Sequence, residues 1–130
     1  MFMNSDLVEY LEYLCSENDN INDLIVVSNE GLPIALAPSI TGFIDQTLVS
    51  GMCTALKYIG QELISEITGS NLKRILVNCS SGLILIQQLN QDGILVASCK
   101  NDVALSELDI PSIQTYFSAN PPKSLSNIVD

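Results

Sequence analysis

The chain has 130 residues and a net charge of −10, and only 15% of its residues are charged whereas 47% are hydrophobic. Average soluble domains carry about 25% charged residues, so we expect another chain to cover part of this apolar or neutral surface. The charge excludes nucleic acids and anionic membranes as favoured partners, because eight acids and no base precede Lys57 and the five bases form no run longer than two.

The sequence also indicates where the protein acts. No apolar run approaches the roughly 18 residues of a membrane span, and the N-terminus lacks the basic and apolar regions of a signal peptide. Four cysteines (Cys15, Cys53, Cys79 and Cys99) are scattered without a CxxC pair, and the chain has no histidine. This pattern favours free thiols over disulfides or a metal site. We therefore expect a cytoplasmic protein without metal, cofactor or direct membrane insertion.

The first third of the chain predicts a helix and a hairpin. Residues 5–17 place their leucines at spacings of four and three, which is typical of an amphipathic helix. Residues 21–28 and 32–37 are apolar, strand-like runs separated by Asn29-Glu30-Gly31. A turn of this kind between two such runs predicts an antiparallel hairpin.

The longest periodic segment predicts a helix over 41–67, with Thr41 as N-cap and Gly69 as stop. Its large apolar residues recur at spacings of three and four, and they are Ile44, Leu48, Met52, Leu56, Ile59, Leu63 and Ile67. Its remaining face is small and neutral and carries Ser50, Thr54, Lys57, Tyr58 and Gln61. We expect the apolar stripe to pack on the sheet and the neutral face to contact another protein chain, with a helix that is merely poor in charge as the alternative.

The last part of the chain predicts a three-stranded meander over 72–79, 83–89 and 94–99, joined by Ser-Gly and Asp-Gly turns. A final helix begins near Ile110 or Pro111, and residues 119–130 form a loose tail. The order α-β-β-α-β-β-β-α predicts one α+β domain with its core over about residues 5–118. In this fold class, a five-stranded antiparallel sheet carries the long helix on one face, with flanking N- and C-terminal helices.

Catalytic patterns are missing from the sequence. Without histidine there is no Ser-His-Asp or Cys-His arrangement, and the chain has no phosphate-binding GxxxxGK[ST] loop, GxGxxG, GxSxG or HExxH motif. Glu62 and Glu66 lie one helical turn apart, but a solvated helix end explains them better than acid–base chemistry. We expect a binding module and no enzyme.

The sequence resembles the roadblock/LC7 family. The resemblance begins with Leu24-Ile-Val-Val-Ser-Asn-Glu-Gly-Leu-Pro-Ile-Ala35, which is similar to the family's first hairpin, and continues through the long helix. It ends with Arg74-Ile-Leu-Val-Asn-Cys, Gly82-Leu-Ile-Leu-Ile and Gly93-Ile-Leu-Val-Ala-Ser in the meander. Residues 101–108 depart from the short, glycine-containing link that is common in the family. Longin and profilin-like domains share a related architecture.

The resemblance implies a dimer and a partner. Family members pair their third strand with its mate across a two-fold axis, and the long helices sit together. Here that dimer interface comprises Leu72, Lys73, Arg74, Ile75, Leu76, Val77 and Asn78. Members also bind small Ras-like GTPases, and others attach to dynein.

Three functions follow as hypotheses. The first is a homodimer, or a heterodimer with a paralogue, that serves as a platform or regulator for a small Ras-like GTPase, with Tyr58 as the best anchor. The second is a constitutive structural subunit of a motor or trafficking assembly. The third is a small-molecule sensor, although no polar cluster converges within the apolar stripes.

Overall fold

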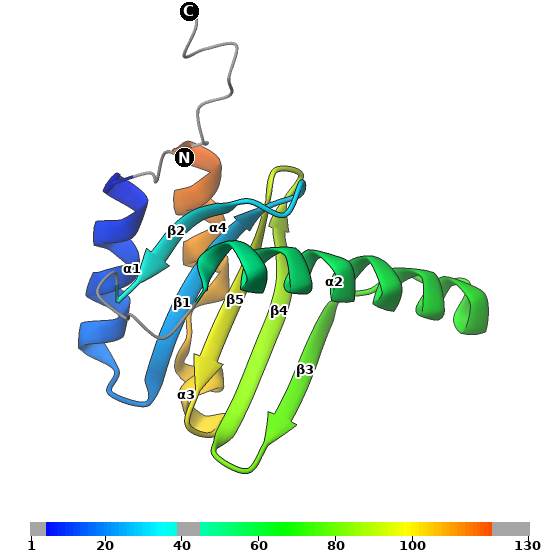
Figure 1. Ribbon diagram of the computed structural model, residues 1–130. Helices are drawn as coiled ribbons and strands as arrows, with labels where there is room; N and C mark the ends of the chain where they lie inside the picture. The colour runs from blue at the N-terminus through cyan, green and yellow to red at the C-terminus, as the bar shows by residue number, and fades with distance from the viewer. Residues whose placement is uncertain (1–4, 39–44, 121–130) are drawn as a thin grey trace, which may run out of the picture.

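The computed structural model describes residues 5–38 and 45–120, and it has the predicted α+β class, with a five-stranded antiparallel sheet between helices (Figure 1). The helices are α1 (Ser5–Glu17), α2 (Gln46–Thr68), α3 (Asp102–Glu107) and α4 (Ile110–Ala119). The strands are β1 (Ile21–Ser28), β2 (Pro33–Ala37), β3 (Arg74–Cys79), β4 (Gly82–Asn90) and β5 (Gly93–Cys99).

The sheet has the order β2-β1-β5-β4-β3, and every neighbouring pair is antiparallel. The two predicted hairpin groups are confirmed, and they join where β1 pairs with β5, with Leu24 opposite Ala97. Gly31 lies in the β1–β2 turn with φ +88°, a conformation that glycine adopts without the steric cost of a side chain. In this strand order, β2 and β3 form the two edges of the sheet.

The larger core lies between the sheet and the layer of α1, α3 and α4, on the face behind the sheet in Figure 1. Leu7, Leu11, Ile113 and Phe117 are fully buried there. Gly93 is part of this packing, because a Cβ atom at this position would lie 2.5 Å from the Phe117 ring. The helices of this layer are therefore fixed to the sheet by large apolar side chains.

A smaller core lies on the opposite face, beneath α2. The sheet contributes large residues to it, namely Ile25, Val27, Leu36, Ile86, Ile94 and Val96, whereas α2 contributes only Cys53 as a buried apolar side chain. In Figure 1, α2 crosses this face and its C-terminal end projects beyond β3. Much of the long helix thus lies against no other part of the described chain.

The boundaries of α1 and β1 match the sequence prediction, and those of the other strands differ by one or two residues. Helix α2 begins at Gln46, after Asp45 as N-cap, so the predicted N-cap at Thr41 is wrong; Thr41 itself lies outside the described residues. The predicted stop at Gly69 is confirmed by its φ of +70°. The short α3 is not predicted by the sequence. The loose tail was predicted over residues 119–130, but Ala119 is the last residue of α4, and residues 121–130 lie outside the described residues.

Candidate interaction surface

Two side-chain hydrogen bonds define the start of α2 and its attachment to the segment before β3. At its start, Asp45 accepts a hydrogen bond from the backbone N–H of Leu48 at 3.1 Å, which satisfies one of the free donors of the first turn. Further along, the side-chain oxygen of Gln61 accepts a hydrogen bond from the backbone N–H of Leu72 at 2.9 Å. The segment that leads into β3 is thereby tied to the helix.

The face of α2 that packs on the sheet is the small, neutral one. Ser50 is fully buried and Cys53 is 6% exposed. Gly60 also allows close approach, because a Cβ atom there would lie 3.2 Å from Ile75 and 3.3 Å from Leu72. Since the sheet already supplies large side chains to this layer, small helix residues are the ones that fit between helix and sheet.

The apolar stripe of α2 therefore points into solvent, opposite to the sequence expectation. Its described members are between 44% and 72% exposed, and they are Leu48, Met52, Leu56, Ile59, Leu63 and Ile67. Ile44 lies outside the described residues. Contiguous exposed apolar surface of this kind marks an interaction site on a folded protein. We call this set, without Ile44, the α2 stripe.

The neutral face that was predicted to contact a partner divides into two parts. Ser50 is buried against the sheet, so its assignment as partner-facing is wrong. Thr54, Lys57 and Gln61 are half-buried, whereas Tyr58 is 67% exposed. These four residues line a groove of about 740 Å³ together with Asn29, Gln88 and Asn90 from the hairpin ends of the sheet. Among the described residues that line this groove, Lys57 alone is charged.

Strand β3 forms an open edge of the sheet. Within the described chain it pairs only with β4, and Leu76 and Val77 are 48% and 41% exposed. Ile84, opposite Val77 on β4, is 36% exposed. An edge strand with free backbone groups and exposed apolar side chains is a template for pairing with another strand.

The other residues of the predicted dimer interface surround this edge. Lys73, Arg74 and Asn78 are exposed, whereas Leu72 and Ile75 are half-buried because they pack beneath α2 at Gly60. The structure therefore brings the exposed edge of β3 and the projecting end of α2 to the same side of the molecule (Figure 1). Periodicity located the residues of the α2 stripe but could not predict their orientation, because it does not show whether the sheet or another chain would cover them.

The four thiols differ in the direction in which their surroundings shift the pKa. Hydrogen bonds with Ser81 lower the pKa of the exposed Cys79 thiol, whereas burial raises the pKa of Cys15 to about 11 and also raises the pKa of Cys53 and Cys99. All four are free. Among residues 5–38 and 45–120, no group of three or more histidine, cysteine, aspartate or glutamate residues is placed to hold a metal ion. In the same part of the chain, no helix is long and apolar enough to cross a bilayer.

Comparison with known proteins supports the fold. Residues 10–98 match the family model described as Roadblock/LC7 domain. A Roadblock/LC7 domain from Streptomyces avermitilis superposes with a TM-score of 0.74 at 12% identity, covering 91% of this chain and 97% of the other. MglB from Myxococcus xanthus gives 0.72 at 13% identity, with 88% and 97% covered. The gliding protein MglB from Thermus thermophilus gives 0.62 at 10% identity, with 88% and 82% covered. No curated protein matches in sequence.

Proposed function

The chain belongs to the Roadblock/LC7 domain family, and from this premise we propose that it is a non-enzymatic dimer that serves as a platform or regulator for a small Ras-like GTPase. The observation that carries the proposal is the exposed α2 stripe beside the open edge of β3. In a monomer, the α2 stripe and the open edge of β3 would both remain exposed to water. Its four free thiols fit the reducing cytoplasm as the place of action.

The sequence of β3 is compatible with pairing to a second copy of itself. In an antiparallel pair centred on Leu76, Arg74 of each strand lies opposite Asn78 of the other, and Ile75 lies opposite Val77. No like charges face each other in this register, and like charges directly opposite would destabilise the pair. The apolar centre of the strand lies against its own copy, so a homodimer satisfies the edge without a paralogue. One structure with the same fold is described as MglB with tetrameric arrangement, which agrees with self-association in this fold.

The GTPase surface is the groove beside Tyr58. At about 100° per residue, Tyr58 lies roughly 130° around the helix axis from the centre of the α2 stripe. The stripe is thus available to the sister subunit while Tyr58, Lys57, Thr54 and Gln61 stay open to a third chain. An exposed tyrosine suits an anchor of a protein interface, since tyrosine is enriched among the residues that dominate binding energy.

The test is size-exclusion chromatography with light scattering, with the protein alone and then with Ras-like GTPases loaded with GDP or a non-hydrolysable GTP analogue. We expect a dimer that forms a larger complex with one nucleotide form. Tyr58→Ala should abolish the larger complex and leave the dimer intact, whereas Ser106→Ala, an exposed change on α3 at the other face of the sheet, should affect neither. A dimer indifferent to nucleotide state would favour a constitutive structural subunit, and a monomer would refute the proposal.

A further inference from the structure

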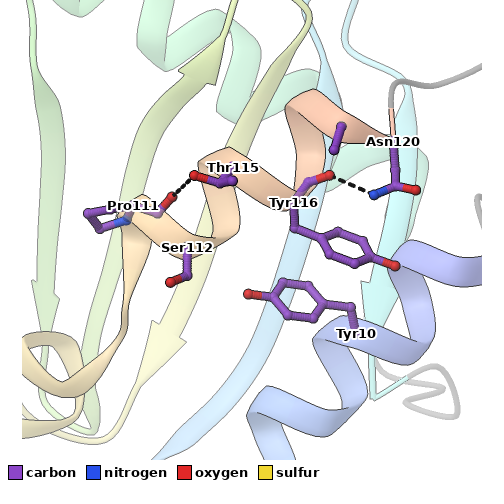
Figure 2. A pocket seen from close by; sticks show the side chains of 7 residues that line it. Tyr10, Pro111, Ser112, Thr115, Tyr116 and Asn120 are labelled. Carbon is purple, nitrogen blue, oxygen red and sulfur yellow. Dashed lines mark hydrogen bonds between the residues drawn. The ribbon is translucent and has the colours of Figure 1, made fainter.

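A second groove lies on the face of the molecule away from α2, between α1 and α4 (Figure 2). Its volume is about 450 Å³, within the range of pockets that hold ligands. The rings of Tyr10 and Tyr116 stack in it with their centroids 4.2 Å apart and an interplanar angle of 11°. The Tyr116 hydroxyl donates a hydrogen bond to the backbone carbonyl of Asp6 at 3.2 Å, which fixes the ring pair. Pro111 and Ala119 complete the apolar lining.

Within the described helices beside this groove, the charge has one sign. The layer formed by α1, α3, α4 and the N-cap of α4 contains no lysine or arginine. Its acids are Asp6, Glu9, Glu12, Glu17, Asp102, Glu107 and Asp109. Helix α2, by contrast, carries Lys57 with Glu62 and Glu66. Seven of the chain's fifteen acids thus lie in this layer, with no base in its helices to offset them.

The acids lie close to the tyrosines. On α1, Asp6, Tyr10, Tyr13 and Glu17 follow one another at spacings of four, three and four, so they share one face of the helix. Tyr13 is 58% exposed. Burial, and then the charge of Asp109 at the start of α4, raise the pKa of Tyr10, so this carboxylate lies within electrostatic reach of the ring.

We propose that the groove between α1 and α4 is a docking site for a basic peptide segment of a protein partner. Lysine and arginine side chains lay their apolar stems along aromatic surface and keep their charged ends near carboxylates, and cations are also attracted to the faces of tyrosine rings. The groove offers both features: Tyr10 and Tyr116 form its aromatic wall, Asp6 lies one helical turn before Tyr10, and Asp109 accepts hydrogen bonds from Ser112 in the lining. The site is independent of the proposed dimer and GTPase surfaces, so the protein has binding faces on both sides of its sheet.

The experiment measures binding of a fluorescein-labelled synthetic peptide of alternating arginine and leucine by anisotropy, against the same peptide with glutamate in place of arginine. Ala119→Trp fills the groove from an exposed position, and should weaken binding of the arginine peptide at least about tenfold, as expected for loss of an anchor pocket. Asp6→Asn with Asp109→Asn removes two charges and keeps a capping side chain before α4; we expect a loss of about two- to fivefold. Glu62→Gln with Glu66→Gln on α2 changes the net charge equally and should leave binding unchanged.

The site of binding is then mapped from amide chemical shifts in NMR spectra. Shifts at Ser112, Thr115 and Ala119 on addition of the arginine peptide would support the proposal. Equal losses in the two double variants, or wild-type binding by Ala119→Trp, would show general attraction to an acidic protein and overturn it. The proposal would also fail if the glutamate peptide bound as tightly as the arginine peptide, or if the shifts fell on α2. Shifts that appeared with rising protein concentration in the absence of peptide would overturn it too, because a second copy of the chain would then occupy the groove.

Discussion

Ile59 offers a sharp test of whether the α2 stripe is a dimer surface, because it is 62% exposed and lies in the middle of the stripe. Full burial of an isoleucine side chain contributes roughly 1.5–3 kcal/mol, so covering the exposed part contributes about 1–2 kcal/mol. Ile59→Ala keeps one methyl group, and we expect it to reduce the association free energy by about 1 kcal/mol per copy. A two-fold dimer contains two copies, so the change should cost about 2 kcal/mol and raise the dimer Kd about 30-fold.

The assay is sedimentation equilibrium over a range of concentrations, with thermal unfolding followed by circular dichroism. Alanine is the best helix former and Ile59 contacts little in the protomer, so the fold should persist. Ile59→Asp should give only monomer, because an interface would have to bury an unpaired carboxylate. Ser65→Ala, exposed on the opposite flank of α2, is the matched control. A wild-type Kd for both Ile59 variants would show that the stripe is not the dimer surface.

Three further expectations concern single residues. Gly82→Ala should destabilise the protein by about 2–4 kcal/mol in chemical denaturation, because a Cβ at φ +150° would collide with the carbonyl oxygen of Cys99; unchanged stability would contradict the strand geometry. Cys79 should be alkylated by iodoacetamide faster than the other three thiols near neutral pH, because its lowered pKa gives it a larger fraction of thiolate. Mass spectrometry of timed samples measures the four rates, and a faster rate at another cysteine would contradict this expectation. Asp45→Ala should cost about 1 kcal/mol of stability and Asp45→Asn much less, because asparagine also caps a helix; equal losses would argue against the cap.

The sequence predicted the elements better than their orientation. Helix α1 and strand β1 were found because their hydrophobic periods and flanking turns agree. Helix α3 was missed because it has only six residues, too few for periodicity to register. The facing of α2 was misjudged because a stripe of large apolar residues marks a surface to be buried without naming the chain that buries it. In this protein small residues face the sheet, as the burial of Ser50 shows. The sequence alone does not reveal that burial.

The groove between α1 and α4 also lay beyond the sequence. Tyr10 and Tyr116 are more than a hundred residues apart, and the packing of α1 and α4 on one face of the sheet brings their rings together. The sequence shows that these helices contain no lysine or arginine, but only the fold shows that the helices lie together on one face of the sheet.

The two edges of the sheet differ in a way that would limit the size of the proposed assembly. Strand β2 starts with Pro33, all five of its residues are buried, and α1 packs against it, whereas β3 is exposed. Proline and cover are the means by which proteins close a strand edge. A subunit with one open edge has a valency of one for strand addition, so in the proposed dimer pairing would use up that site and growth would stop at two copies. The proposed extension of the sheet across a two-fold axis would then carry no risk of polymerising into a fibre.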